Sequence, residues 1–322
     1  MTKPKKISIV VPCYNEEAVL PELFRRLDGV AVTWGMDYEI ICVDDGSYDR
    51  TWELLKEQNQ KDNHWQCLSF ARNFGHQTAV FAGLYDADGD YVAIMDADLQ
   101  DPPEFLAVCL SKLNEGYDVV YAVRRKRKEG VFKRVCYAAF YRLLKSVAEV
   151  DIPLDSGDFC LMTRRVVMAL KRMPERNVFV RGLRAWAGFR QIGIEYSRPP
   201  RAAGETKYPL RKLVQLAFDG VFAFSSLPMR LATYLGFGAL AVSFALILFV
   251  VVWKWSGLQF LGHYPSEVPG WTSMVCVVLF LGGIQFLILG CMGEYIGRIY
   301  NEVKHRPRWI VRERTDGNNS KQ

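Results

Sequence analysis

Short apolar runs alternate with helically spaced apolar residues along the first third of the chain. Each run is mostly apolar and stops at polar residues, which is typical of a strand buried on both faces of a parallel sheet. Strand and helix patterns that alternate in this way predict an α/β fold, a mostly parallel sheet flanked by helices in three layers. The expected strands are 7–11, 38–43, 66–70, 91–95 and 118–123, and the expected helices between the first four are 18–27, 51–60 and 78–87.

Polar side chains follow four of the expected strands. The carboxyl ends of parallel strands meet at one edge of a sheet, where open α/β folds bind ligands. We therefore expect a cleft lined by these strand ends. The sequence contains neither a G-x-G-x-x-G fingerprint nor a Walker-type loop, which argues against a dinucleotide cofactor and a P-loop. The strand-end residues are Asn15 and Glu16, Asp44 and Asp45, Arg72 and Asn73, and Asp96 and Asp98.

Asp96 and Asp98 stand directly after the apolar run 91–95. A hard cation such as Mg²⁺ takes carboxylate oxygens together with substrate phosphate oxygens, and it neutralises charge on a leaving phosphate. This pair therefore indicates metal-assisted binding of a diphosphate. The alternative is a polar turn in which Asp98 or Asp101 caps a helix that begins at Pro102.

Two long apolar segments lie in the last third of the chain, at residues 229–253 and 271–292. Each is long enough to cross a bilayer, and the basic residues that flank the pair predict that both ends face the cytoplasm. A buried soluble hairpin is the alternative. Residues 208–224 carry apolar residues at helical spacing beside Arg211 and Lys212, so they form either an interfacial helix or a packing helix of the soluble part.

Composition supports this division of the chain. Hydrophobic residues make up 50% of the chain, the net charge is +6, and no nucleic-acid-binding motif is present. The basic residues cluster beside the apolar segments, which favours an anionic membrane surface over nucleic acid as the partner.

The eight cysteines show no C-x-x-C spacing and fit buried thiols in a reducing compartment. The apolar run 7–11 is too short for a signal peptide, so the soluble part is expected in the cytoplasm.

Three motifs, each at a strand end, resemble the family-2 glycosyltransferases, which have the Rossmann-like GT-A fold. They are residues 10–16, 43–47 and 96–103. The chain is similar to the branch that loads a sugar onto a polyprenyl phosphate: dolichol-phosphate mannose synthases and, more closely, bacterial bactoprenol (undecaprenyl-phosphate) glucosyltransferases. The resemblance extends to about Arg308. Its later part rests on residues 155–159, 164–167, 201–210 and 293–298.

The resemblance assigns roles to residues at the strand ends. The nucleobase and ribose of a nucleotide-sugar donor, UDP-linked by preference, would contact Pro12, Tyr14, Glu16 and Asp45. The donor side would also include Asp96, Ala97 and Arg124. Arg124 would face the donor phosphates or sugar; the alternative is that it only begins a solvated basic run, 124–128. Mg²⁺ or Mn²⁺ would be bound by Asp96, Asp98 and Gln100, and the residues taking part in the reaction would be Asp98 and Asp158.

The acceptor side is expected to involve three further residues. The sequence places Asp158 in a turn with Ser156 and Gly157, where it would orient the acceptor or stabilise positive charge at the sugar; a turn aspartate or helix cap is the alternative. Arg201 and Lys207 suit the acceptor's phosphate, and they also suit anionic lipid beside the membrane. His76 could reach the cleft, but a lone histidine is more often structural, so it is not counted as a site residue.

By resemblance, the reaction would invert the anomeric centre and transfer one sugar, glucose favoured, to undecaprenyl phosphate at the cytoplasmic face of the plasma or inner membrane. GDP-mannose, UDP-N-acetylglucosamine and amino-arabinose donors stay open, as do a processive polysaccharide synthase and a nonenzymatic scaffold. A homo-oligomer, with a tetramer as one form, is also implied. The expected organisation is a catalytic domain, a juxtamembrane amphipathic helix, a two-helix transmembrane hairpin and a cytoplasmic tail, at residues 1–207, 208–226, 227–296 and 297–322.

Overall fold

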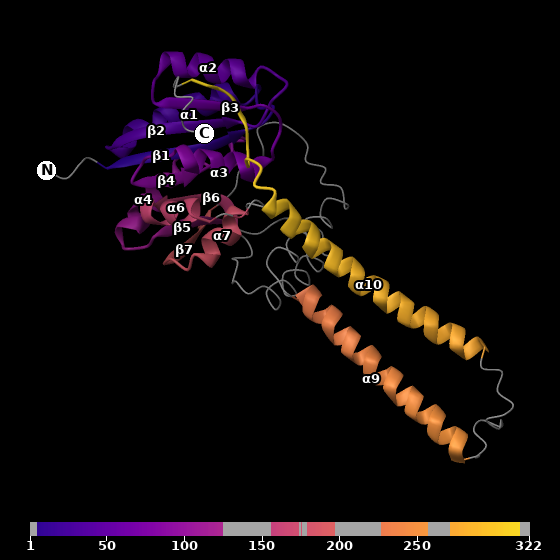
Figure 1. Cartoon of the computed structure of the whole chain (residues 1–322). Coiled ribbons are helices and arrows are strands. Elements are labelled where there is room, and N and C mark those ends of the chain that lie inside the picture. Colours follow the sequence, from indigo (N-terminus) through magenta and orange to yellow (C-terminus); the bar gives the residue numbers. More distant parts are fainter. Residues whose placement is uncertain are drawn as a thin grey trace. The chain divides into compact units, whose positions relative to one another are not determined.

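The computed structural model describes residues 5–124, 156–173, 175, 179–196, 227–256 and 271–315. These residues form two compact units. The first, here called the sheet unit, contains the described residues up to 196 together with 306–315, and the second, the helical unit, contains those from 227 to 305 (Figure 1).

The sheet unit is built on an eight-stranded sheet in the order β7-β5-β6-β4-β1-β2-β3-β8. Strands β1 to β4 are parallel, as expected, while β6 runs antiparallel to β4 and β8 antiparallel to β3. The expected mostly parallel α/β sheet is therefore present. Its strands are β1 Lys6–Cys13, β2 Asp37–Asp44, β3 Trp65–Phe70, β4 Tyr91–Ile94, β5 Val119–Arg124, β6 Ser156–Thr163, β7 Gln191–Tyr196 and β8 Val311–Arg314.

Helices cover both faces of this sheet. Successive strand residues point to opposite faces, so Ile9 joins a core with α1, α2 and α4, whereas Val10 joins a core with α3, α6 and α7. This arrangement gives the three layers that the alternation predicts. The helices are α1 Leu20–Ala31, η1 Val32–Trp34, α2 Thr51–Lys61, α3 His76–Asp86, α4 Phe105–Asn114, α6 Arg164–Lys171 and α7 Val180–Trp186.

The last described residues return to the sheet, which sequence reasoning missed by assigning 297–322 to a tail. Strand β8 pairs with β3, and the Trp309 ring stacks on Phe70 with ring centroids 6.4 Å apart. Strand β8 has four residues, among them two arginines and a glutamate. It therefore lacks the apolar run by which a buried strand is predicted from sequence. The predicted domain 1–207 therefore does not contain the whole sheet.

The thiols fit the expectation of reduced, buried cysteines. The described cysteines of the sheet unit are free and buried.

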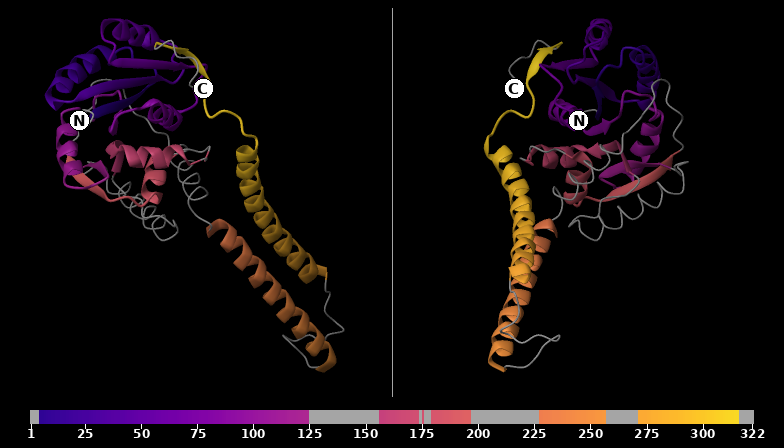
Figure 2. Two further views of the ribbon diagram at one scale, coloured as in Figure 1. Left: turned by 60° about the vertical axis from the view of Figure 1, so that its left-hand side comes forward. Right: turned by 90° about the vertical axis from the view of Figure 1, so that its right-hand side faces the viewer.

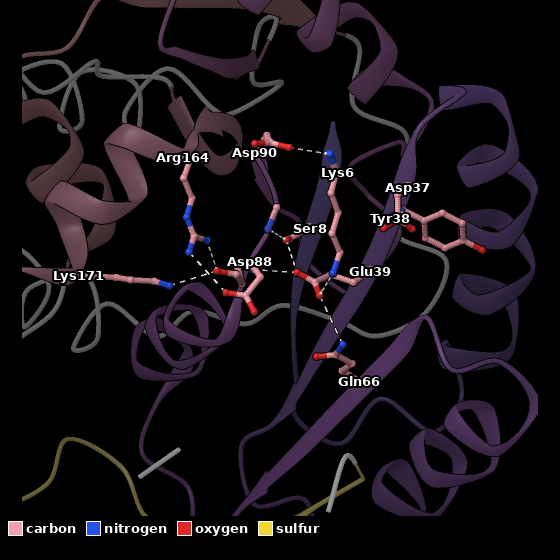
Figure 3. A network of polar contacts seen from close by, with 12 residues as sticks. Lys6, Ser8, Asp37, Tyr38, Glu39, Gln66, Asp88, Asp90, Arg164 and Lys171 are labelled. Carbon is pink, nitrogen blue, oxygen red and sulfur yellow. Dashed lines mark hydrogen bonds and ion pairs between the residues drawn. The ribbon is translucent and has the colours of Figure 1, made fainter. Parts of the chain in front are cut away.

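The amino-terminal edge of the sheet holds a buried polar network centred on Glu39 (Figure 3). Its carboxylate accepts hydrogen bonds from Lys6 Nζ at 2.6 Å, Ser8 Oγ at 2.5 Å and the Asp88 amide at 2.9 Å. These contacts join β1 and β2 to the turn that precedes β4. The network lies at the sheet edge opposite the carboxyl ends of β1 to β4, so we assign it to stability.

Replacing Glu39 by alanine should destabilise the sheet unit by about 3–5 kcal/mol, because Lys6 and two other donors lose a buried partner. For a domain of this size the midpoint of thermal unfolding should fall by roughly 6–20 °C. Tryptophan fluorescence of the purified full-length chain measures it. The exposed Glu53→Ala on α2 serves as control and should change stability by about 0.5 kcal/mol or less. Equal shifts in the two variants would contradict the assignment.

The helical unit consists of two long apolar helices, α9 Leu227–Ser256 and α10 Trp271–Val303, which contact each other and lie side by side in the left view of Figure 2. Within the described part of the chain, one segment, Phe280–Gly297 of α10, has the length and composition to cross a membrane. The expected hairpin of two transmembrane helices therefore stays a prediction. Residues 208–226, expected to form the amphipathic helix, lie outside the described residues.

Candidate functional site

The strand register brings the polar strand ends together at the carboxyl edge of the sheet. Cys13 of β1 pairs with Asp44 of β2, which pairs with Ser69 of β3, while Ile94 of β4 pairs with Val10 on the other side of β1. Residues that immediately follow these strands therefore emerge at one edge, as the sequence predicts.

The loops after β1 and β2 are joined by hydrogen bonds. The Asn15 amide donates to Ser47 Oγ at 2.9 Å, and the Tyr48 amide donates to Asn15 Oδ1 at 3.0 Å. Asn15 has a φ of 55°, which turns the chain sharply between its neighbours Tyr14 and Glu16. Pro12 is buried in β1, Glu16 is half-buried, and Tyr14 is 41% exposed. Tyr14 is thus the most accessible of these predicted donor-binding side chains.

Asp45 organises the loop between β3 and α3. Its carboxylate accepts hydrogen bonds from the Phe74 amide at 2.6 Å and the Gly75 amide at 2.9 Å. Burial raises the pKa of Asp45 above its usual value, although these two amides work in the opposite direction. Asp45 therefore fixes the conformation of the β3–α3 loop, which borders the predicted donor site.

Asp96 and Asp98 follow β4, and their surroundings differ. Asp96 Oδ1 lies 2.9 Å from His76 Nε2, while Asp98 Oδ1 accepts a hydrogen bond from the Gln100 amide at 3.1 Å. Helix α4 begins at Phe105, and its N-cap residue Glu104 makes no side-chain capping hydrogen bond. Both Ala97 and Gln100 are buried in this turn.

The structure corrects the expected location of Asp158. Ser156, Gly157 and Asp158 lie in strand β6, not in a turn, because the segment pairs with β4 and β5. Cys160 of β6 pairs with Ile94 of β4. The antiparallel register, continued two residues beyond that pair, brings Asp158 level with Asp96. Strand reversal thus carries Asp158 to the same edge as the other candidate site residues.

Asp158 is held by an arginine and a glutamine. Arg181 Nε lies 2.7 Å from its Oδ1, and Arg181 Nη2 and Gln77 Nε2 lie 3.3 Å and 3.0 Å from its Oδ2. Burial would raise the pKa of Asp158, but the Arg181 charge and hydrogen bonds outweigh it and hold this pKa below its usual value. Asp158 is therefore a carboxylate at neutral pH and a weak proton acceptor.

The first turn of α3 connects the two parts of the site. His76 contacts Asp96 and its neighbour Gln77 contacts Asp158, while Gln77 Oε1 also accepts the Val180 amide of α7 at 3.0 Å. Burial lowers the pKa of His76, but the hydrogen bond with Asp96 and the nearby carboxylate charges outweigh it and raise this pKa. His76 is not among the site residues expected from the sequence; its place in the polar segment 72–76 that follows an expected strand was the available signal.

Of the three remaining predicted site residues, the structure describes one, Arg124. Arg124 is the last residue of β5, at the same sheet edge. Arg201 and Lys207, predicted for the acceptor phosphate, lie outside the described residues.

The described residues fit a divalent cation that is bound together with a ligand. Among them, no group of three His, Cys, Asp or Glu side chains is placed to bind a metal ion. Mg²⁺ and Mn²⁺ are commonly held by one or two protein carboxylates, waters and substrate phosphates. Asp96 and Asp98 supply this oxygen chemistry at the strand end.

Comparison with known proteins identifies relatives over nearly the whole chain. Residues 8–170 match the family described as Glycosyl transferase family 2. An uncharacterized glycosyltransferase of Bacillus subtilis (strain 168) is 47% identical over 314 residues, covering 97% of this chain and 95% of the relative. A bactoprenol glucosyl transferase of Shigella phage SfV is 39% identical over 308 residues, covering 95% and 98%.

Among solved structures, glucosyl-3-phosphoglycerate synthase from Mycobacterium tuberculosis in complex with Mn²⁺, UDP and glucosyl-3-phosphoglycerate matches with a TM-score of 0.47. It is 19% identical, and the match covers 68% of this chain and 78% of that chain.

Proposed function

Because this chain belongs to glycosyl transferase family 2, we propose that it transfers glucose from UDP-glucose to undecaprenyl phosphate at the cytoplasmic face of a membrane. The glycosyltransferase activity follows from the family. The lipid acceptor is supported by relatives named bactoprenol glucosyl transferase that match over almost their whole length. The observation that carries the proposal is the convergence of Asp96 and Asp158 at one sheet edge.

The donor would bind across the carboxyl ends of β1, β2 and β4. Tyr14 and Glu16 flank Asn15 in the loop after β1, which is hydrogen-bonded to the loop after β2, and the nucleobase and ribose would lie here. The diphosphate would lie at Asp96 and Asp98, directly after β4. A divalent cation bound with Asp96, Asp98 and Gln100 would neutralise charge on the departing diphosphate.

In the proposed reaction an oxygen of the acceptor phosphate bonds to the anomeric carbon as the bond from that carbon to the UDP β-phosphate oxygen breaks. UDP leaves with the bonding electrons, and the anomeric centre inverts. The acceptor phosphate is already an anion at neutral pH, so the step requires little base catalysis.

Asp158 would then act by position and charge. Its low pKa makes it a poor base, whereas its bidentate contact fixes the Arg181 guanidinium at the site. We propose that Asp158 orients Arg181 and adds negative charge near the sugar, where positive charge develops. This interpretation selects the electrostatic and orienting roles over proton abstraction.

The acceptor requires a membrane, and the helical unit would supply the anchor. Helices α9 and α10 contain 30 and 33 residues, or about 45–50 Å each, enough to span a bilayer. Large apolar side chains are exposed along both helices, as expected of surfaces that face lipid. Examples are Phe237, Phe244 and Val252 of α9 and Met274, Phe280 and Phe286 of α10.

A donor panel tests the proposed function. The full-length chain would receive undecaprenyl phosphate, Mn²⁺ or Mg²⁺, and one labelled donor at a time, chosen from UDP-glucose, UDP-N-acetylglucosamine, UDP-galactose and GDP-mannose. We expect label to enter the organic phase from UDP-glucose alone, and EDTA to prevent it.

Other outcomes would identify an alternative. Lipid label from a different donor would keep the reaction class and replace the sugar, whereas labelled polysaccharide would indicate a processive synthase. If no donor labels lipid and UDP does not bind, the transferase proposal is wrong and a nonenzymatic scaffold is favoured.

A further inference from the structure

We propose that Arg312, in strand β8 after the second apolar helix, is a positioning residue for the nucleotide-sugar site, and that the Ile310 carbonyl supports the same site. The inference deepens the proposed function and rests on it for the identity of the donor. Neither the family match at residues 8–170 nor the predicted domain 1–207 includes the segment 308–314, to which both residues belong.

Arg312 begins a chain of hydrogen bonds that crosses the edge of the sheet. Its Nη2 donates to Ser69 Oγ at 2.9 Å, and Ser69 Oγ donates to Asp44 Oδ2 at 2.6 Å. The same guanidinium nitrogen lies 3.8 Å from Asp44 Oδ2. Asp44 is fully buried, so the positive charge of Arg312 compensates a carboxylate that would otherwise be costly to bury.

The chain continues to the residues predicted to contact the donor. Asp44 Oδ1 accepts the Ser47 amide at 3.0 Å, and Ser47 Oγ accepts the Asn15 amide at 2.9 Å. Asn15 lies between Tyr14 and Glu16. A change at Arg312 should therefore reach the nucleobase side of the site through Asp44 and the 44–47 turn.

A second contact braces the neighbouring loop. The Ile310 carbonyl accepts the Ala71 amide at 2.9 Å, just where the β3–α3 loop begins, and this loop supplies the Phe74 and Gly75 amides to Asp45. The segment therefore contacts both loops that shape the predicted donor site.

Other contacts keep the segment in place without Arg312. Arg314 Nη1 lies 2.5 Å from Asp86 Oδ2, and the Arg308 guanidinium lies over Phe81, 4.8 Å from its centroid. Strand β8 also keeps its backbone pairing with β3. An Arg312 variant should accordingly retain β8 and lose the support of the Asp44 turn.

The test compares three variants of the full-length chain: Arg312→Ala, the conservative Arg312→Lys, and Glu313→Gln as a control. Glu313 is the next residue of β8, contacts Trp52 on the other face of the strand, and keeps a hydrogen-bond acceptor as glutamine. UDP with Mn²⁺ is the binding probe, and KM and kcat are measured with UDP-glucose. Hydrogen exchange is followed in peptides that cover 44–50 and, for reference, 160–170.

We expect Arg312→Ala to weaken UDP binding and raise the donor KM about tenfold, with kcat changed by less than about threefold. Arg312→Lys should recover most of this loss, and Glu313→Gln should match the unaltered chain. Exchange in Arg312→Ala should accelerate in 44–50 and stay unchanged in 160–170, because the Ser47 amide loses its fixed acceptor.

Equal UDP affinity in Arg312→Ala and the unaltered chain would overturn the inference, as would equal effects of Arg312→Ala and Glu313→Gln. If the unaltered chain does not bind UDP, the proposed donor is wrong, and hydrogen exchange alone decides the role of Arg312. Unchanged exchange in 44–50 then refutes it, and selective acceleration supports it.

Discussion

Asp98→Asn should lower sugar transfer to the lipid about 10³-fold. The substitution keeps the size of the side chain and removes the charge with which Asp98 would hold a divalent cation against the diphosphate. Loss of such charge stabilisation typically costs several kcal/mol in the transition state. The initial rate of lipid labelling at saturating donor, measured over a Mn²⁺ titration, gives the effect. The residual activity should require more Mn²⁺ than the unaltered chain does.

Asp88→Asn is the matched control for this prediction. Asp88 is an exposed carboxylate in the turn at the opposite edge of the sheet, 3.5 Å from Arg164. Its substitution changes the net charge by the same amount, and transfer should stay within about twofold of the unaltered rate. An Asp98→Asn variant with full, metal-dependent transfer would remove Asp98 from the site.

Asp158→Asn should lower kcat about 100-fold. Asparagine has one neutral oxygen, so it cannot replace the two carboxylate oxygens that contact the Arg181 guanidinium. Arg181→Gln should cause a similar loss. If the two residues act as one unit, the double variant should be no more than about threefold slower than the slower single variant. Single-turnover rates at saturating donor and acceptor measure the three effects. Unchanged turnover in Asp158→Asn would refute the role of Asp158, and multiplicative losses would show that the residues act separately.

Asp118→Asn provides the control for disrupting a buried carboxylate–arginine pair. Asp118 is 4% exposed, contacts Arg165, and accepts the Arg190 amide at 3.2 Å. It lies just before β5, at the start of that strand and away from the carboxyl edge. This variant should lose stability and keep kcat in the fraction that remains folded.

The pH dependence of the Asp158 contribution follows from its lowered pKa. A carboxylate with a folded-state pKa below its unfolded value stabilises the fold above the unfolded pKa, and this stabilisation is lost as pH falls through the folded value. Between pH 6 and 8 Asp158 should therefore stay ionised, and neither stability nor activity should vary through its titration. Unfolding midpoints of the unaltered chain and Asp158→Asn across this range test the expectation. Their difference should vary only through His76, whose raised pKa the Asp158 charge supports, so it should be larger at pH 6 than at pH 8.

Sequence reasoning placed the candidate residues after β1, β2 and β4 at one sheet edge, because local pattern fixes the ends of these strands. A run such as 91–95 forms a buried strand from its own composition, and the residue after it must emerge at the strand end. Asp45, Asp96 and Asp98 could be placed at one edge for that reason. The wrong expectation of a turn at Asp158 has the converse cause. Its strand forms by pairing with β4 and β5, which are distant in sequence.

The sequence by itself determined the α/β alternation, the strands that carry the candidate carboxylates, the two apolar segments and the family. These features depend on periodicity and on motifs of a few residues. The tertiary structure alone decided that Arg181 and Gln77 hold Asp158, that His76 contacts Asp96, and that β8 completes the sheet and directs Arg312 to Asp44. Each of these contacts joins polar residues far apart in the chain, and polar residues carry no periodic signal that identifies their partners. Their positions depend on strand order and register, which are fixed only when the whole sheet packs against its helices.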